Sequence, residues 1–475
     1  MRREMHIGSC VVLLAWAGMA LGQAVWFVDA AGGGDYSSIQ AAIEAAGSGD
    51  EILVAPGTYR EAIDFMGKAI RLYSAAGAES TTIDGTGHSH VVQCVSGEGA
   101  DTILEGFTIT GGNAAESYEP GGGLWSHESS PTVNRCIFLG NDARYGGGIS
   151  GDATVTDCTF RNNVAYTGGG TWRTRTIIRC AFIGNGASTG GAISGAQTVN
   201  GCTFIDNEEG VWDVETVIDC TFAGAFGNTG LTNAATVINC RFTGSGIMAS
   251  GDVRTLVTNG TFINTDGIFT AQEGGITLTN CIVWGNAAGG VFGPIVVTYS
   301  DVEGCWPGEG NISRDPLFAD ADGRLSANSP CIDAGTNTLP GGLPSTDIEG
   351  NPRPLDGNGD GLAIADMGAY EHAAVPPRPL NADQLLTDLS DAVTSLDLPP
   401  KVEASLNAKL KTARKLLQGH SEKNGVAAAN TLKAFCKSVE TQRGKKISVA
   451  QADALIASAQ EIIRLLAKPQ SRVIR

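Results

Sequence analysis

The clearest pattern of apolar and polar positions along this chain is a unit that recurs about every 20 residues between positions 132 and 286. Most copies have a threonine, a cysteine four positions later and a phenylalanine two positions after that, as in Thr132, Cys136 and Phe138. Two apolar residues at this spacing share one face of a strand, so both are expected to face a core. The anchor cysteines are Cys136, Cys158, Cys180, Cys202, Cys220, Cys240 and Cys281, with Gly260 in the copy that lacks one.

A repeat of this length with β-branched runs and glycine-rich connections cannot bury its apolar face alone, so its copies must stack on one another. A helical repeat would be longer and poorer in glycine, and a leucine-rich repeat would show a leucine skeleton. The pattern therefore predicts an all-β, right-handed parallel β-helix over residues 23–300. We expect three short strands per turn, each paired with its equivalent in the next turn.

Polar positions of the repeat predict its outer surface. The residue before the anchor should point outward, and Arg135, Asp157 and Arg179 alternate in sign there, as stacked ion pairs would. The later copies carry asparagine at this position and predict an amide ladder: Asn239, Asn259 and Asn280. A second set of asparagines, five positions after the anchor, predicts turns with left-handed backbone angles: Asn141, Asn163, Asn185, Asn207 and Asn286.

The two ends of the chain have a different pattern. Residues 1–22 combine Arg2 and Arg3 with an apolar run and small residues, which predicts a cleavable signal peptide and hence export. Residues 373–380 are rich in proline and predict a stiff linker. Residues 381–475 predict a helical domain, because apolar residues recur there at helical spacing. Its expected helices are 382–396, 401–417, 422–442 and 449–466, the last opened by a capping box of Ser448 and Gln451.

Charge separates the same two parts. The tail from His372 carries 16 Lys/Arg and 9 Asp/Glu, a net charge of +7. Since the whole chain has a net charge of −18, the part before His372 has a net charge of −25. Such an acidic body argues against nucleic acid as a partner. After the signal peptide, no run of about 20 apolar residues predicts a transmembrane segment. The ladder cysteines are expected to be buried free thiols, because stacked Cβ atoms lie too far apart for a relaxed disulfide.

Several motifs resemble known families. Residues 38–46 and 49–61 resemble the opening of the pectin-lyase-like β-helix superfamily, which implies an amphipathic helix that caps the first turn. The motifs at 121–124, 146–149 and 190–193, two or three glycines before an apolar residue, resemble the repeats of polymorphic outer membrane proteins. No terminal β-barrel is recognisable here, which puts autotransport by that route in doubt.

The end of the β-helix and the tail carry two further resemblances. Residues 329–335, 347–353 and 366–371 resemble the terminal module of exported bacterial surface proteins called choice-of-anchor Q, and we expect this module over residues 301–372. The helical tail resembles the FIMAH domain of exported bacterial proteins. Together these resemblances imply a bacterial protein that is secreted or held at the cell surface.

Candidate catalytic residues are few. Asn264, Thr265 and Asp266 match the first active-site motif of polygalacturonases, but the next turns, 272–286, contain one Glu and no Asp, His or Arg, whereas glycoside hydrolysis takes a pair of carboxyl groups. Residues 57–61 resemble the start of pectin methylesterases, without the later Asp and Arg motifs of those enzymes. His88 and His90 are candidate metal ligands or ordinary surface residues. No catalytic residue is predicted.

One motif predicts a metal site. Asp356, Asn358 and Asp360 alternate with glycines as in a calcium-binding loop, and Asp366 stands near the position of the acidic residue that closes such a loop. The alternative is a polar, glycine-rich surface turn. The sequence as a whole predicts a non-catalytic exported surface protein, for adhesion or for polysaccharide binding through a face of the β-helix. The alternative is a polysaccharide lyase or another carbohydrate-active enzyme.

Overall fold

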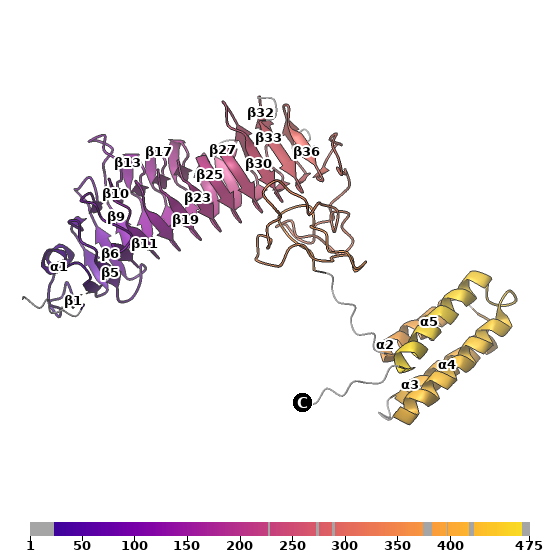
Figure 1. The fold of residues 1–475 in the computed structure, drawn as a ribbon. Coiled ribbons are helices and arrows are strands. Elements are labelled where there is room, and N and C mark those ends of the chain that lie inside the picture. The colour runs from indigo at the N-terminus through magenta and orange to yellow at the C-terminus, as the bar shows by residue number, and fades with distance from the viewer. Residues whose placement is uncertain are drawn as a thin grey trace, which may run out of the picture. The chain divides into compact units, whose positions relative to one another are not determined.

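The computed structural model describes residues 23–226, 229–271, 275–286, 290–373, 382–396, 398–417 and 422–467 (Figure 1). The predicted signal peptide and all but the first residue of the predicted linker lie outside these residues. The chain divides into two units, Met1–Ala373 and Ala374–Arg475, which we describe separately. No helix in the described residues is long and apolar enough to cross a membrane.

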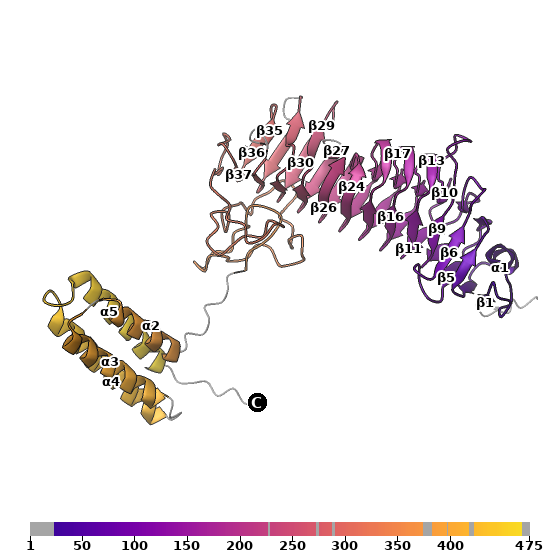
Figure 2. The same ribbon diagram turned by 180° about the vertical axis from the view of Figure 1, so that it is seen from behind.

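The first unit is a parallel β-helix of about 12 turns, which confirms the predicted fold (Figure 1, Figure 2). Its strands form ladders in which each strand pairs in parallel with its equivalent one turn away. The first ladder consists of β1 (Val25–Val28), β2 (Glu51–Val54), β5 (Arg71–Ser74), β8 (Ile103–Glu105), β11 (Thr132–Asn134), β15 (Thr154–Thr156), β19 (Thr176–Ile178), β23 (Thr198–Asn200), β25 (Val211–Ile218), β27 (Thr229–Ile238), β30 (Thr255–Thr258), β33 (Ile276–Thr279) and β36 (Val296–Thr298).

The second ladder follows the first around each turn and carries the repeated phenylalanines. It consists of β3 (Gly57–Tyr59), β6 (Thr81–Asp84), β9 (Thr108–Thr110), β12 (Ile137–Leu139), β16 (Thr159–Arg161), β20 (Ala181–Ile183), β24 (Thr203–Glu208), β26 (Thr221–Phe226), β28 (Arg241–Thr243), β31 (Thr261–Ile263), β34 (Ile282–Trp284) and β37 (Asp301–Val302). A short third ladder comes next, formed by β13 (Asp142–Tyr145), β17 (Val164–Thr167) and β21 (Gly186–Thr189) with the end of β24.

The fourth ladder closes each turn and leads back to the first. It consists of β4 (Ile63–Asp64), β7 (Val92–Cys94), β10 (Leu124–Ser126), β14 (Ile149–Ser150), β18 (Thr171–Trp172), β22 (Ile193–Ser194), the first parts of β25 and β27, β29 (Gly246–Ala249), β32 (Ile268–Thr270) and β35 (Val291–Phe292). The middle turns thus contain four short strands, and the prediction of three is wrong for them. The extra corner lies at the residue before each anchor, such as Arg135 with φ 51°, where the left-handed backbone ends one strand before the next begins.

The interior confirms the predicted core. The repeated phenylalanines form an inner phenylalanine ladder, with neighbouring ring centroids 4.5–5.2 Å apart and each ring at most 2% exposed. Its members are Phe138, Phe160, Phe182, Phe204, Phe222, Phe242 and Phe262. The anchor cysteines are buried free thiols, and burial raises the pKa of Cys158 and of Cys220. Many accept a backbone N–H from the previous turn, as Cys158 Sγ does from Cys136 at 3.3 Å.

The asparagines five positions after the anchor do not have the predicted left-handed backbone. That conformation belongs to the preceding residue, for example Gly140 and Asn162. The asparagines instead point inward, and from Asn141 to Asn207 each amide bonds to the next: Asn141 Nδ2 donates to Asn163 Oδ1 at 3.1 Å, and Asn163 in turn to Asn185 at 3.0 Å. A buried amide needs such partners, so this inner amide ladder satisfies polar groups within the core.

The predicted outer ion pairs form, with one change of partner. Arg179 binds Asp157 through two bonds of 2.7 and 2.8 Å, and these lower the pKa of Asp157. Arg135 pairs with Glu105 of the previous turn at 2.8 Å. The predicted amide ladder forms only in part: Asn259 Nδ2 donates to Asn239 Oδ1 at 3.0 Å, whereas the Asn280 amide bonds to the backbone of Thr336.

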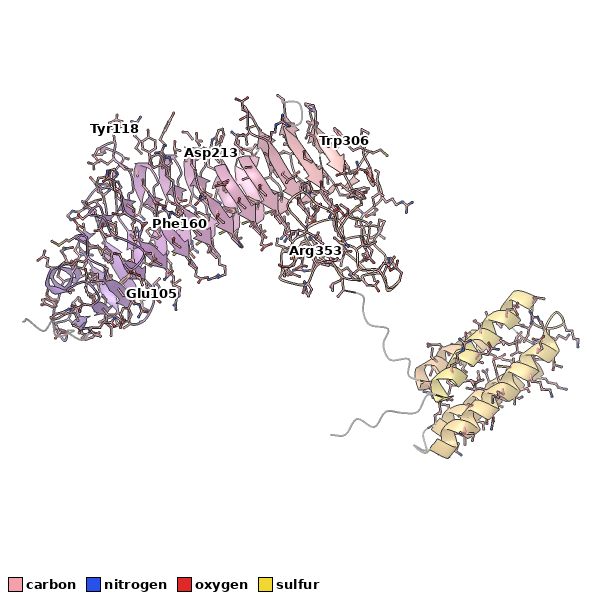
Figure 3. The ribbon with its side chains drawn as sticks, in the orientation of Figure 1. Glu105, Tyr118, Phe160, Asp213, Trp306 and Arg353 are labelled. Carbon is pink, nitrogen blue, oxygen red and sulfur yellow. The ribbon has the colours of Figure 1, made fainter. Side chains whose placement is uncertain are left out.

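That later amide ladder is covered by residues 301–373, which fold over the last turns. Asn239, Asn259 and Asn280 are at most 1% exposed. The covering segment bonds to them directly: Asn239 Nδ2 donates to Thr346 O and Asn280 Nδ2 to Thr336 O, each at 2.9 Å. Residues 301–373 therefore protect the lower corner of the final turns, where Figure 3 shows Arg353.

At the other end of the β-helix, the predicted capping helix is present as α1 (Ile39–Ala45), which buries Ile39, Ala42 and Ile43. The Glu61 carboxylate accepts the backbone N–H groups of Ile39 and Gln40, both at 2.9 Å, at the N-terminus of this helix.

The second unit contains four helices, α2 (Ala382–Thr394), α3 (Pro400–Leu417), α4 (Glu422–Gln442) and α5 (Val449–Ala467). These bounds agree with the predicted segments to within two residues. Leu406, Leu432, Phe435 and Ile462 are among the side chains that build its core. The predicted capping box forms through Ser448 and Gln451, whose side chains each accept the other's backbone N–H.

Candidate functional site

The outward-facing positions of the fourth ladder form a continuous row of aromatic and small side chains. In these strands the residue after a buried one points out of the β-helix, as Trp125 does after Leu124 and Trp172 after Thr171. The register places these residues one above another along nine turns. We call them the outer aromatic ladder: Trp125, Ser150, Trp172, Ser194, Trp212, Thr232, Met248, Phe269 and Phe292.

Glycines at the preceding corner set the position of this row. In the middle turns three residues connect the third ladder to the fourth, and the first of them, Gly168, has φ 68°. A Cβ atom on Gly168 would lie 2.3 Å from the carbonyl oxygen of Thr171 and 3.0 Å from Cβ of Trp172. Gly148 is equally restricted, since its Cβ would lie 2.6 Å from the carbonyl oxygen of Gly170. The repeated glycines therefore allow the sharp corner that holds each outer residue in register.

The two kinds of residue in the row differ in exposure. The rings of Trp125, Trp172 and Trp212 are partly exposed. Between them, Ser150 and Ser194 are 2% and 6% exposed, although they also belong to the outward-facing row. Larger neighbours cover the short serine side chains, so the tryptophan rings supply the exposed part of the row in these turns.

Cationic and aromatic groups adjoin the row. The guanidinium of Arg173 lies 4.5 Å from the ring centroid of Trp172, and the ring of Tyr145 lies 4.8 Å from that of Trp172. Arg144 packs over Tyr118, 5.0 Å from its centroid. Tyr118 is 70% exposed, and Figure 3 shows it with Asp213 along the upper edge of the β-helix, away from Glu105 and Arg353. The upper edge thus offers partly exposed rings, each packed against a neighbouring side chain, beside hydrogen-bond donors.

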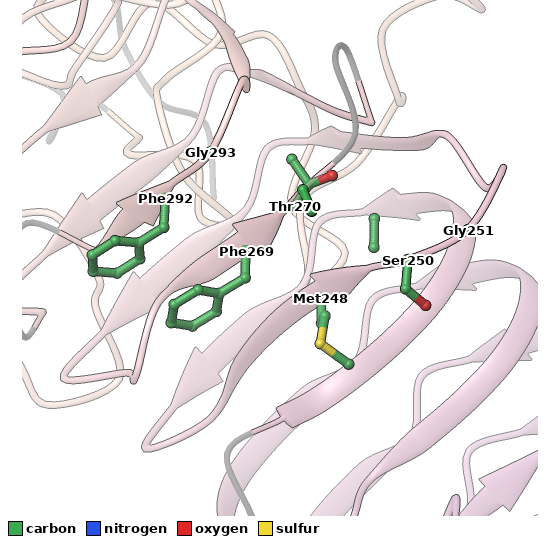
Figure 4. A pocket seen from close by; sticks show the side chains of 9 residues that line it. Met248, Ser250, Gly251, Phe269, Thr270, Phe292 and Gly293 are labelled. Atoms are coloured by element: carbon green, nitrogen blue, oxygen red, sulfur yellow. The ribbon is translucent and has the colours of Figure 1, made fainter.

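The row ends in an apolar groove over the last turns (Figure 4). Phe269 and Phe292 stack with centroids 4.7 Å apart and an interplanar angle of 6°, and Met248 continues the row on the adjacent strand. Together with Ala249, Ser250, Gly251, Thr270, Ala271 and Gly293 they line a cavity of about 560 Å³. This volume is within the range of ligand-binding clefts.

The histidines singled out in the sequence lie at the start of this row. His90 is buried; its Nδ1 is 2.9 Å from the carbonyl oxygen of Gly121 and its Nε2 is 3.3 Å from a carboxylate oxygen of Glu119. Its ring lies 4.8 Å from that of Trp125. His88 is exposed. His90 therefore supports the loop and the ring of Trp125.

The polygalacturonase-like motif lies in a turn. Asn264 has φ 52°, the conformation of the equivalent turn residue in other copies. Thr265 donates to Asn286 Oδ1 through its backbone at 2.7 Å and through its hydroxyl at 2.8 Å. The Asp266 side chain is exposed and has no hydrogen-bond or ion-pair partner within the described residues. The motif is thus accounted for by the repeat.

The predicted calcium loop is exposed and internally hydrogen-bonded. Asp356 Oδ1 accepts the backbone N–H of Gly359 at 2.7 Å, and its Oδ2 that of Gly361 at 2.9 Å. Asp333, which the sequence did not suggest, accepts the N–H groups of residues 357 and 358. Across the described ranges, no three Asp, Glu, His or Cys side chains are grouped so that they could hold a metal ion.

Asp366, the fourth predicted calcium ligand, has a buried side chain and is bonded to other parts of the segment. It is 0% exposed, and its two oxygens accept the backbone N–H groups of Asp333 at 2.8 Å and of His372 at 2.6 Å. Burial, reinforced by the nearby Glu371 carboxylate, raises the pKa of Asp366 to about 7. Glu371 is in turn bound by Arg353 at 2.6 Å, with both side chains fully buried. Calcium binding by the loop itself stays a prediction.

The outer aromatic ladder was missed in the sequence, although a signal for it exists. Each of its residues stands two positions after a corner that usually ends in glycine, as in Gly123-Leu124-Trp125 and Gly267-Ile268-Phe269. Aligning the copies on these glycines, and not only on the cysteines, brings the aromatic residues into one column.

No protein-family model and no curated protein matches this chain. Among solved structures, it is similar to the pectin methylesterase from Aspergillus niger, with 16% identity, a TM-score of 0.31, and coverage of 61% of this chain and 90% of that chain. It is also similar to the pectin methylesterase from carrot, with 16% identity, a TM-score of 0.25, and coverage of 63% and 85%. The similarity is confined to the parallel β-helix fold.

Proposed function

We propose that this chain is a non-catalytic exported protein that binds a polysaccharide along its outer aromatic ladder. The observation that carries the proposal is the row of partly exposed tryptophan and phenylalanine rings in parallel register on one edge of the β-helix. Such rings are costly to leave in water and are typical of surfaces that bind a partner.

The chemistry of the row suits sugars. The C–H groups on the face of a pyranose ring pack against an aromatic face, while its hydroxyl groups point sideways to polar neighbours. Tryptophan offers a large flat apolar surface with little conformational entropy to lose. Arg173 and Asp213, both exposed beside Trp172 and Trp212, supply a hydrogen-bond donor and an acceptor at the edge of the row.

The absence of catalysis is part of the proposal. Hydrolysis of a glycosidic bond takes two carboxyl groups placed on either side of it. The one motif that resembles a glycosidase, at Asp266, is a turn of the repeat, and its neighbours Thr265 and Asn286 are bonded to each other. Export follows from the predicted signal peptide, and the basic helical unit is proposed as an attachment module at the cell surface.

The test is a glycan-binding screen of the secreted protein with wild type, Trp172→Ala and Trp212→Ala, accompanied by an assay for reducing ends and unsaturated products. The matched control is Tyr73→Ala, because Arg71 lies over the Tyr73 ring at 4.1 Å, as Arg173 does over Trp172, but Tyr73 belongs to the first ladder. We expect each tryptophan variant to bind about tenfold more weakly or worse. The control should bind like wild type.

Two outcomes would contradict the proposal. If Trp172→Ala and Trp212→Ala both bind the glycan as tightly as wild type, the outer aromatic ladder is excluded as the site. Release of products from a polysaccharide would favour the other candidate, a polysaccharide lyase or another carbohydrate-active enzyme, and loss of that release in Asp266→Asn would place the chemistry at the turn.

A further inference from the structure

The outer aromatic ladder repeats every two turns over most of its length. Large apolar side chains alternate with small polar ones in the register of the fourth ladder. The large residues are Trp125, Trp172, Trp212 and Met248, and the small residues between them are Ser150, Ser194 and Thr232. The fold itself repeats every turn, so this alternation is a property of the surface and not of the scaffold.

The next position in the chain alternates in the same way. From Ser150 to Trp212, each residue of the row is followed by one with a left-handed backbone at the corner. Charged residues follow the tryptophans, Arg173 after Trp172 and Asp213 after Trp212, and both are exposed. Glycines follow the serines at 151 and 195. A ring and a charged group thus occur together at Trp172 and again two turns later at Trp212, whereas buried Ser126 follows Trp125.

Two turns of a parallel β-helix correspond to about 10 Å, because neighbouring strands lie 4.7–4.9 Å apart. The four large residues therefore span roughly 29 Å along the axis of the β-helix. An advance of about 10 Å is comparable to the length of two sugar rings in an extended chain. The repeat of the surface and the repeat of such a ligand would coincide.

We infer that the ligand is a linear β-1,4-linked polysaccharide that lies along the axis of the β-helix, with every second sugar ring packed against the exposed part of a tryptophan. This inference rests on the proposed function and adds the class of ligand. In an extended β-1,4-linked chain, successive rings are flipped, so alternate rings present the same face. The flipped rings lie over the turns of Ser150 and Ser194, whose side chains do not reach the surface.

The experiment measures affinity against chain length for two series of oligosaccharides, β-1,4-linked and β-1,3-linked glucose chains of two to eight sugars. β-1,3-linked chains curve and do not present the same face at every second ring. We expect the β-1,4 series to bind with affinity that rises in steps, about tenfold for each second sugar. Trp172→Ala should remove one step, and Tyr73→Ala, the control in the first ladder, should remove none.

The outcomes separate this inference from the proposed function. Affinity that rises evenly with each sugar, equal binding of the two series, or a screen in which only other polysaccharides bind would overturn the two-sugar register while leaving polysaccharide binding intact. If no polysaccharide binds at all, the proposed function fails as well. Steps of two sugars that survive in Trp172→Ala would place the register somewhere other than the outer aromatic ladder.

Discussion

The inner phenylalanine ladder and the outer aromatic ladder both run along the axis of the same β-helix, yet they differ in continuity and in contact with water. Inside, phenylalanine recurs in every turn from Phe138 to Phe262, and no ring is more than 2% exposed. Outside, tryptophan alternates with small residues such as Ser150 and Ser194, and its rings are partly exposed.

The difference teaches what each ladder is for. The core of a β-helix has nearly the same cross-section in every turn, so a ring that fits one turn is needed in the next. On the outside, a serine completes the turn as well as a tryptophan does, so packing does not require the tryptophans. Rings that folding does not require, and that water partly contacts, are better explained by a ligand.

The largest expected effect comes from removing a ring of the inner phenylalanine ladder. Phe182→Ala removes a buried ring that stacks on both Phe160 and Phe204, and should lower the free energy of unfolding by about 3–5 kcal/mol. Urea unfolding measures this. Phe182→Leu, which keeps most of the volume, should cost less and fold well enough for a binding assay, in which glycan affinity stays at the wild-type level. A cost below about 1 kcal/mol for the alanine variant would show that the inner stack is not a rigid core.

A change of pH sharpens the comparison, because neither ladder contains a titratable side chain, whereas the segment that covers the last turns does. The pKa of Asp366 is about 7 in the folded protein, through burial and the nearby Glu371, and near 4 in the unfolded chain. The folded state therefore binds the extra proton between these values, and stability should fall as pH rises from about 4 to about 7, on the order of a few kcal/mol.

Thermal unfolding of wild type and Asp366→Asn across this range checks the effect. The variant should show a flatter dependence on pH, whatever its absolute stability, while glycan binding by the folded wild type stays constant. An equally steep dependence in both proteins would assign the titration to other groups, among which Glu371 also has a pKa raised by burial.

Calcium offers a smaller effect that should likewise leave both ladders unchanged. If the loop of Asp356, Asn358 and Asp360 binds calcium, a concentration ten times the Kd stabilises the protein by about 1.4 kcal/mol. The expected observation is a higher melting temperature in calcium than in chelator, lost in Asp356→Asn. Identical melting curves in the two buffers would remove the site, and a shift retained in the variant would place it elsewhere.

The smallest expected effect concerns folding without the outer rings. Trp172→Ala should lower the free energy of unfolding by roughly 1 kcal/mol, because the ring is partly exposed and its loss removes the contacts with Tyr145 and Arg173. Urea unfolding of Trp172→Ala beside Phe182→Ala gives the direct contrast. A cost for Trp172 that approaches that of Phe182 would make the outer ladder part of the scaffold.

Much of the fold was predictable from the sequence, because the same residue types recur at fixed spacing. The period and the buried side of Cys136 and Phe138 indicate the β-helix, and helical spacing together with the Ser448 capping box gives the helices of the second unit. The four-stranded turns were not predictable in the same way. The left-handed backbone at Arg135 divides the run of residues into two strands. Arginine has no preference for this backbone conformation, so the sequence does not indicate the division.

The candidate site was harder to predict for a physical reason. Trp125 and Trp172 lie 47 positions apart in the sequence. They come into one row only because the turn that contains Ser150 stacks between their two turns. Similarly, Asp366 reads as a ligand of a nearby loop, whereas contacts with Glu371 and His372 hold it in the buried network. Both outcomes depend on which turns stack and which segment covers them, and local patterns do not contain this information.

The most direct test of the account is a crystal structure of the protein with the oligosaccharide that binds most tightly in the glycan screen. The account predicts electron density for sugar rings over Trp125, Trp172 and Trp212, with the chain along the axis of the β-helix and polar contacts to Arg173 and Asp213. Sugar density on another face, such as the ion-paired corner at Asp157 and Arg179, with these tryptophans left in contact with solvent, would contradict it.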